Sequence, residues 1–382
     1  MEWIYLYLIL AITFVWWRAS LLFISEARKK IDYPPFTKKV TIIIPTYNEN
    51  KYMLVSLVES VLYATRDIDA EIIIGDDGSK TKVEEILSSL DKAKLEKIKI
   101  LTLPHQGKKE TQEACFRYST GEVIITMDSD ILMEKNAIYE LIKPFNDPKV
   151  GATTSNIKIL NEDDNWLTKA TGTLYWNSFN VARKSLSVFG IVNICSGALS
   201  AYKREAFQKV LNRYINQKFL GKKCVHGDDR ALTNLILKED YKVKYIDKSI
   251  CYTISPNNLF KFIKQQYRWR QSGVREGLIC LSFSFKKNKL LFIETFFVLS
   301  LPFVSIAILI TIILYAIKFP FIIPGLLIGI LITTLIHNLF LIIENPKRFY
   351  RAFIFTILNY LFLLWLWPIA LINVRSENWG TR

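Results

Sequence analysis

Several familiar sequence signals are missing, and each absence removes a class of protein. The five cysteines are scattered and form no C-x-x-C pair, which argues against a disulfide framework or a zinc site and fits a reducing cytosol. No glycine-rich phosphate loop of the G-x-x-x-x-G-K-[ST] or G-x-G-x-x-G type occurs, so a P-loop or dinucleotide-binding fold is not expected. No lysine or arginine precedes Arg18, so the N-terminus lacks the basic region of a signal peptide.

Charged residues are scarce towards the end of the chain. Only nine follow Leu290, namely Glu294, Lys318, Glu344, Lys347, Arg348, Arg351, Arg375, Glu377 and Arg382. The 382 residues as a whole are 51% hydrophobic with a net charge of +15, a composition that excludes a disordered or fibrous protein. Nucleic acid, an anionic membrane surface or a polyanionic ligand would each match this charge, and the hydrophobic ends favour the membrane surface.

Residues 3–24 form the first long apolar run, interrupted only by Arg18 and Ser20. This run is long enough to cross a bilayer core of about 30 Å. Basic residues follow between Arg28 and Lys39, so the positive-inside rule places the chain from residue 26 onward in the cytoplasm. The run is therefore predicted to span the membrane, with a buried core helix as the alternative.

Three further apolar runs, residues 290–317, 321–343 and 353–374, follow the middle of the chain. The link between the last two contains three basic residues and is expected in the cytoplasm. Three full crossings would leave the C-terminus outside, whereas Arg375 and Arg382 favour the inside. One run, residues 353–374 with Pro368 near its end, is therefore expected to re-enter or lie flat, and the number of crossings stays open.

The middle of the chain opens with strands that alternate with helices. Apolar, β-branched runs predict strands at residues 40–44, 71–74, 98–103 and 122–127, and helical spacing of apolar residues predicts helices at 51–64 and 83–90. This order indicates an α/β fold with a doubly wound, mostly parallel sheet. Ligands of such sheets bind at the carboxyl ends of the strands.

Polar residues follow three of these strands. Thr46 comes after the first strand, Asp76 and Asp77 after the second, and Asp128 and Asp130 after the fourth. Asp-Asp-Gly-Ser is also a common turn composition. Two carboxylates at the end of a buried strand repel each other unless a cation shares them, so Asp128 and Asp130 are predicted to bind Mg²⁺ or Mn²⁺ with substrate phosphates. This metal site, without a phosphate loop, points to a nucleotide-diphosphate leaving group.

Two later motifs complete the candidate site. Gly227-Asp228-Asp229-Arg230 precedes an apolar helix, where the acids either favour the helix dipole or provide a general base. Gln265-Gln266-Tyr267-Arg268-Trp269 falls in a basic amphipathic segment, residues 259–285, which is typical of a helix at the membrane surface. A carbohydrate-binding tryptophan is the alternative interpretation of Trp269.

In this order and spacing the motifs resemble those of membrane-embedded processive glycosyltransferases of family 2 with the GT-A fold, the group of cellulose, chitin and hyaluronan synthases. The resemblance covers residues 41–382. It is closest to the streptococcal and vertebrate hyaluronan synthases, through residues 195–200, 216–221, 227–234, 264–269 and 379–382. The chain departs from them at Ala198, where proline is usual, and in showing one N-terminal span where two are usual.

The resemblance implies a role for each candidate residue. Nucleotide-binding residues would be Thr46, Asp76, Asp77, Lys108 and Arg382, and the metal ligands would be Asp128 and Asp130. Asp229 would be the base that deprotonates the acceptor hydroxyl, with inversion of configuration and a β-linkage. The acceptor and diphosphate part of the site would contain Cys195, Asp228, Gln265, Arg268, Trp269 and Trp379. A solvated loop lysine and a structural cysteine are the alternatives for Lys108 and Cys195.

The resemblance also implies an organisation and an activity. The expected parts are a transmembrane helix at 1–25, a cytoplasmic GT-A domain at 39–255, amphipathic interface helices at 256–289, transmembrane helices at 290–375 and a tail at 376–382. We expect a multi-pass protein of the cell membrane that polymerises UDP-GlcNAc and UDP-GlcA and moves the growing polysaccharide across the lipid bilayer. No nucleic acid partner is expected, and the sequence does not indicate an oligomeric state.

Other activities fit part of this pattern. A chitin-type or other β-linked polysaccharide synthase would use a single UDP-sugar. A non-processive lipid-linked sugar transferase shares the Asp-x-Asp motif but normally lacks Q-x-x-R-W. A transport or scaffold protein with an inactive transferase domain is the last alternative, and the intact acidic motifs argue against it.

Overall fold

The structure is a computed structural model that describes residues 2–27, 31–320, 324, 328–329, 331–332, 334–335 and 338–375. Several predicted features fall outside these residues. Ten of the 23 residues of the apolar run 321–343 do so, as does the tail with Trp379 and Arg382. The predictions made for them stay predictions.

One eight-stranded sheet organises the middle of the chain, in the order β3-β2-β1-β4-β7-β6-β10-β5. The strands are β1 (Val40–Thr46), β2 (Ala70–Asp76), β3 (Ile98–Thr102), β4 (Val123–Met127), β5 (Ile131–Met133), β6 (Val150–Ile159), β7 (Leu199–Lys203) and β10 (Lys242–Thr253). Neighbouring strands are parallel except where β7 pairs with β4 and β6 and where β5 pairs with β10. This mostly parallel sheet confirms the predicted α/β class.

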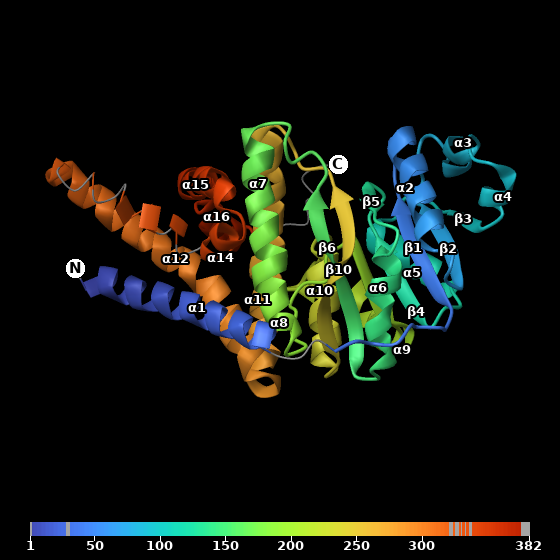
Figure 1. Cartoon of the computed structure of the whole chain (residues 1–382), viewed down its shortest axis with the longest axis horizontal. Coiled ribbons are helices and arrows are strands. Elements are labelled where there is room, and N and C mark those ends of the chain that lie inside the picture. Colours follow the sequence, from blue (N-terminus) through green and yellow to red (C-terminus); the bar gives the residue numbers. More distant parts are fainter. Residues whose placement is uncertain are drawn as a thin grey trace.

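Helices cover the sheet on both faces (Figure 1). They are α2 (Lys51–Ala64), α3 (Val83–Leu87), α4 (Lys92–Leu95), α5 (Lys108–Arg117), α6 (Ala137–Ile142), α7 (Trp166–Trp176), α8 (Lys184–Ser187), α9 (Arg204–Ile215) and α10 (Asp228–Lys238). A 3₁₀ turn (Lys143–Asn146) follows α6, a π-helical segment (Asn177–Arg183) joins α7 to α8, and a small hairpin of β8 (Lys218–Phe219) and β9 (Lys222–Lys223) follows α9. The predicted first four strands and the helix at 51–64 are confirmed, whereas α3 ends earlier than predicted.

The first four strands form where the sequence is richest in β-branched residues. In β1, Val40 through Ile44 are all buried, and β2 and β4 present similar isoleucine runs to the same core. The helix α2 begins where the Asn50 side chain accepts hydrogen bonds from two backbone N–H groups of its first turn. Because β1, β2 and β4 are parallel, the polar residues that follow them lie at one edge of the sheet.

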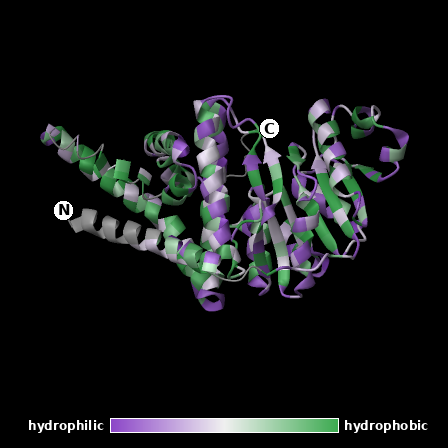
Figure 2. Cartoon of the chain, viewed as in Figure 1, coloured by the Kyte–Doolittle hydropathy of each residue, from purple (hydrophilic) through white to green (hydrophobic). Residues whose placement is uncertain are grey.

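Long helices extend from one side of the sheet domain (Figure 1). They are α1 (Glu2–Ala27), α11 (Leu259–Lys287), α12 (Lys289–Lys318) and the chain of shorter helices α14 (Leu339–Glu344), η4 (Pro346–Arg348), α15 (Phe349–Leu358), η5 (Asn359–Leu363) and α16 (Leu366–Ile372). Two segments, Lys289–Lys318 and Pro346–Ile372, are long and apolar enough to cross a membrane. Figure 2 shows the projecting part of α12 as mainly hydrophobic.

An ion pair joins the N-terminal helix to α12. Arg18 pairs with the fully buried Glu294, and the Trp17 indole N–H also donates to that carboxylate over 3.2 Å. Arg18 reaches the backbone oxygen of Ala182 as well, at the end of the π-helical segment. Glu294 is therefore a structural partner of α1, as expected for a charged group inside an apolar helix.

The last apolar run, residues 353–374, is not one regular helix. A π-helical turn, η5, separates α15 from α16. Leu358 and Leu363 pack with Leu167 of α7 and Phe262 of α11, whereas α16 packs on α11 through Ala370. This part of the chain therefore lies against the helices that border the sheet domain, and its path relative to a membrane stays a prediction.

Candidate active site

A cavity of about 570 Å³ lies between the carboxyl ends of the strands and helix α11. Most residues singled out in the sequence line it: Thr46, Asp77, Lys108, Asp128, Asp130, Asp228, Asp229, Gln265, Arg268 and Trp269. Asp76 and Cys195 do not. Segments more than 200 residues apart in the sequence, from Thr46 to Trp269, therefore share one space, as the motifs predict.

The two aspartates after β2 have different surroundings. Asp77 lies on the cavity wall and accepts backbone hydrogen bonds from Gln106 at 2.8 Å and Gly107 at 3.1 Å. The ring of His105, which stacks on Tyr47 with centroids 4.3 Å apart, lies 3.0 Å from the same carboxylate. Asp76 is buried and does not line the cavity. Its side chain accepts a hydrogen bond from the backbone N–H of Ser79 at 2.9 Å and so stabilises the turn that follows β2.

Lys108 bridges two of the acidic motifs. It is the first residue of α5, and its Nζ lies 2.7 Å from Asp128 and 3.0 Å from Asp228. Burial opposes its charge, but the two carboxylates raise the pKa of Lys108 above its ordinary value. The lysine is therefore a charged link between the end of β4 and the start of α10, and the solvated-loop alternative does not describe it.

The carboxylates after β4 form an acidic corner of the cavity. Partial desolvation at the cavity wall, together with the charges of Asp128 and Glu49, raises the pKa of Asp130 to about 6. Glu49 is held nearby by a 2.7 Å hydrogen bond from the Ser129 hydroxyl. Oxygen donors of this kind suit Mg²⁺ or Mn²⁺. No group of three or more His, Cys, Asp or Glu side chains placed to hold a metal occurs among the described residues, so a cation here needs further oxygens from its ligand.

The neighbouring acids at the start of α10 are electrostatically different. Burial opposes ionisation of Asp228, but its ion pair with Lys108 lowers its pKa. Burial and the charge of Asp228 instead raise the pKa of Asp229. No lysine or arginine in the described part of the chain lies within ion-pair distance of Asp229. Opposite shifts in two adjacent carboxyls are typical of an acid-base pair with separate roles, so Asp229 is the better candidate for a proton acceptor.

Helix α11 supplies the opposite wall through Gln265, Arg268 and Trp269. The ring of Trp269 lies 6.3 Å from that of Tyr175 on α7. Val298 of α12 and Trp367 of α16 line the same cavity. An aromatic wall that shares a cavity with Asp229 is suited to a sugar, because sugar rings stack on aromatic faces.

Cys195 is fully buried, and burial raises its pKa to about 12. Its backbone N–H donates to the Thr233 hydroxyl at 2.8 Å, while its neighbours Ser196 and Gly197 line the cavity. The side chain of Cys195 is therefore that of a structural cysteine and does not form part of the cavity wall.

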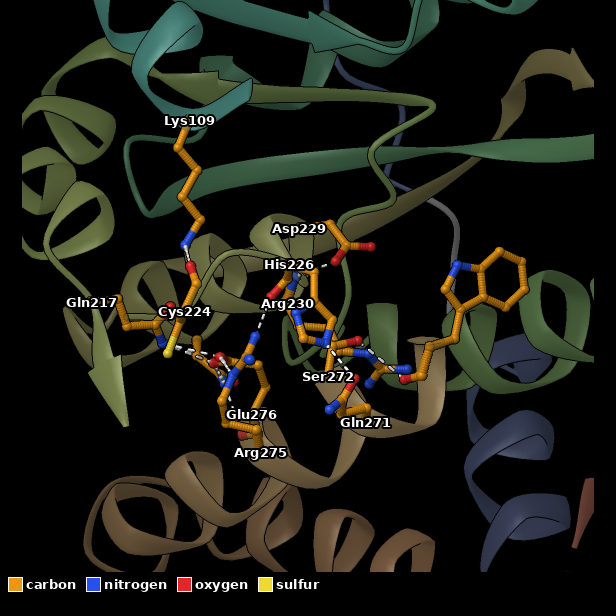
Figure 3. A network of polar contacts seen from close by, with 12 residues as sticks. Lys109, Gln217, Cys224, His226, Asp229, Arg230, Gln271, Ser272, Arg275 and Glu276 are labelled. Carbon is orange, nitrogen blue, oxygen red and sulfur yellow. Dashed lines mark hydrogen bonds and ion pairs between the residues drawn. The ribbon is translucent and has the colours of Figure 1, made fainter. Parts of the chain in front are cut away.

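Polar residues of α11 contact the loop that directly precedes α10 and Asp229 (Figure 3). Arg275 donates to the backbone oxygen of His226, and Gln271 lies 2.9 Å from the His226 ring. Glu276 pairs with Arg275 at 3.2 Å and accepts from Gln217 at 3.0 Å. All of these except Gln217 are buried, so the loop and α11 form one rigid unit.

Sequence reasoning missed several residues of this cavity. Tyr175, Arg183 and His226 all line it, yet none belongs to a motif that was singled out. Of these three residues, only His226 could have been found from the sequence, because it directly precedes Gly227-Asp228-Asp229.

The backbone conformation of Gly227 leads to a testable prediction. Its φ of +81° is a left-handed conformation, and a Cβ there would lie 2.5 Å from Cβ of Ser272. We expect Gly227→Ala to displace Asp229 and to lower kcat by up to about 10²-fold, the cost of a small misplacement of a catalytic group. Gly221→Ala is the matched control, since Gly221 has φ +82° but no atom within 4 Å of its Cβ position. Equal losses in the two variants would contradict the steric argument.

Comparisons with known proteins agree with this geometry. Residues 41–211 match the family model described as Glycosyl transferase family 2. A hyaluronan synthase of Streptococcus pyogenes is 33% identical, covering 99% of this chain and 90% of that protein. An N-acetylglucosaminyltransferase of Azorhizobium caulinodans is 31% identical, covering 67% of this chain and 64% of that protein. A mannosyltransferase of Pyrobaculum calidifontis, solved with GDP-Man and Mn²⁺, is similar in fold at 17% identity, with a TM-score of 0.68 over 100% of this chain and 98% of that one.

Proposed function

The chain belongs to glycosyltransferase family 2 and is related to the hyaluronan synthases, and from this premise we propose that it polymerises UDP-GlcNAc and UDP-GlcA into a β-linked polysaccharide. The proposal includes processive synthesis, a cytoplasmic active site and transfer of the polymer across the cell membrane. The observation that carries it is the extent of the similarity. The hyaluronan synthase matches 99% of this chain, including the apolar helices on either side of the sheet domain.

In the proposed reaction, the uridine end of the donor binds beside Thr46 and Asp77, and Arg268 pairs with the diphosphate. Asp229 takes the proton of the acceptor hydroxyl, whose oxygen attacks the anomeric carbon from the side opposite UDP. The attack inverts the configuration and releases UDP. Trp269 stacks on the acceptor sugar.

Asp128 and Asp130 are the residues that would hold a divalent cation. The bound cation would neutralise the diphosphate as it leaves. Lys108 lies beside this site, because it pairs with both Asp128 and Asp228, and the pairing lowers the pKa of Asp228. Mn²⁺ in the solved mannosyltransferase supports a metal at such a site, without choosing between Mg²⁺ and Mn²⁺.

Incubating membranes with labelled UDP-sugars, singly and paired, tests the proposed function. We expect a long polymer only when UDP-GlcNAc and UDP-GlcA are both present. Polymer from UDP-GlcNAc alone would replace the proposal with a chitin-type synthase, the second candidate, which the similarity to N-acetylglucosaminyltransferases supports. Single-sugar transfer to a lipid would instead indicate a non-processive transferase.

A further prediction concerns the C-terminal tail, whose residues 376–382 would meet Trp269 at the cytoplasmic face. The support is that Gln271 of α11 donates a 2.5 Å hydrogen bond to the backbone oxygen of Asn373, which brings the chain to α11 just before the tail. We expect a cysteine at Ser376 to react with an impermeant reagent only after cells are permeabilised. The five native cysteines are buried, so their background labelling should be low.

Lys318→Cys is the control that should react in intact cells, because Lys318 would lie outside if residues 290–317 cross the membrane from the cytoplasm. Labelling of Ser376→Cys from outside would contradict the placement of the tail. Full activity after removal of residues 376–382 would end its catalytic role.

A further inference from the structure

Arg183 is a buried cation on the cavity wall. It ends the π-helical segment, its exposed fraction is 7%, and it lines the cavity. Its Nε donates to the oxygen of Ile194 at 3.2 Å, and its Nη1 donates to the backbone oxygen and the hydroxyl of Ser178 at 3.2 and 2.5 Å. A guanidinium has five N–H donors. Within the described part of the chain, the two on Nη2 have no acceptor.

The charge of Arg183 is also uncompensated. No carboxylate of the described residues lies within ion-pair distance of it, and burial with the like charge of Arg230 lowers its pKa to about 10. Arg230 lines the same cavity, its guanidinium lying over Gly273 of α11, and Figure 3 shows it next to Asp229. Burying a cation without an ion-pair partner is costly, so Arg183 at the cavity wall favours an anionic ligand.

A row of aromatic rings leads to Arg183 from the acceptor side. Trp269 lies 6.3 Å from Tyr175, Tyr175 lies 6.0 Å from Phe179, and the guanidinium of Arg183 lies 4.1 Å above the Phe179 ring. All four side chains line the cavity. The charged groups with the largest electrostatic effect on Arg183 are Arg230 and Asp229, so Arg183 lies on the side of the cavity where α10 begins. The anion expected at Arg183 is therefore part of the acceptor rather than the diphosphate.

We propose that Arg183, assisted by Arg230, binds the carboxylate of a uronic acid residue in the acceptor chain. The proposal rests on the proposed function in one respect, namely that the cavity holds a polysaccharide acceptor along Trp269 and Tyr175. It adds the residue that distinguishes an acidic chain from a neutral one. The free N–H donors of Arg183 are both on Nη2, and a cationic N–H group forms charge-assisted hydrogen bonds with a carboxylate.

The test compares two matched ligands on the full-length protein in lipid nanodiscs. One is an oligosaccharide of alternating GlcA and GlcNAc, and the other is the same oligosaccharide with its carboxyl groups reduced to alcohols. We expect the wild type to bind the acidic form at least about tenfold more tightly, as for a charge-assisted hydrogen bond of about 1.5 kcal/mol. Arg183→Gln should bind both forms equally, and Arg183→Lys should keep part of the preference.

Binding of UDP in each variant shows whether it has folded. Arg213→Gln is the matched control, because Arg213 is an exposed arginine paired with Glu239 on the surface, and it should behave as wild type. Equal binding of the two forms by the wild type, a full preference retained in Arg183→Gln, or no binding of either form by protein that binds UDP would each overturn the subsite. Failure of the proposed function is separate, since it appears as polymer made from UDP-GlcNAc alone.

Discussion

Replacing Asp229 by asparagine is expected to lower kcat by about 10²- to 10⁴-fold, the usual contribution of general-base catalysis, while the affinity for UDP stays unchanged. The reason is that the two aspartates at the start of α10 have different surroundings. Asp228 is occupied by its ion pair with Lys108, whereas Asp229 has a raised pKa and faces the same cavity as Trp269. Asparagine has a similar shape but cannot take a proton.

The same residue sets the acid limb of the pH profile. A base works deprotonated, so kcat of the wild type should fall as the pH is lowered through the pKa of Asp229, which lies above the ordinary value of 3.8. Asp229→Asn should lack this limb. Asp240→Asn, just beyond the other end of the same helix and mostly exposed, is the control and should keep wild-type kcat. Loss of UDP binding in Asp229→Asn would move the residue into the nucleotide site.

Activity is also expected to disappear in EDTA and to return with Mg²⁺ or Mn²⁺. Asp130→Ala should lose more than about 10²-fold in kcat/KM, because even groups that only support a metal ligand are worth 10- to 100-fold. Its raised pKa shows a carboxyl crowded by Asp128 and Glu49, which a cation would relieve.

Steady-state rates over a titration of each metal measure this effect. Asp67→Ala removes a carboxylate that is 80% exposed and paired with Arg66, and it should leave the metal dependence unchanged. Turnover that survives EDTA, or normal turnover in Asp130→Ala, would remove the metal role from this motif.

The sequence predicted the fold best for those strands and helices that a short local pattern of residues is enough to specify. Strands β1, β2 and β4 are continuous apolar runs, and α2 has both an Asn50 cap and helical spacing, so local patterns suffice. No strand was predicted after Met127. Strand β6 carries Thr153 and Ser155 in its buried centre, and β10 is rich in lysine, so their pairing depends on long-range contacts that no local pattern reveals.

For the site, the acidic motifs and Trp269 were predictable because each combines a chemical type with a position at a strand or helix end. Arg183 was not. Its position at the cavity comes from a π-helical segment, and its lack of an ion-pair partner among the described residues depends on the tertiary structure; neither has a sequence pattern. The prediction of Cys195 as a site residue failed for a different reason. Its motif lies at the cavity, but the side chain of Cys195 itself points into the core.

The cavity is lined by residues from Pro45 to Trp367, and its far wall belongs to α11, α12 and α16. A fragment that ends at Ser255 would keep the sheet and the acidic corner, but it would lack Trp269, Val298 and Trp367. Such a fragment could bind a nucleotide sugar, but it would lack the part of the cavity proposed to bind the acceptor sugar. Any change that shifts α12 or α16 therefore alters the shape of this end of the cavity directly.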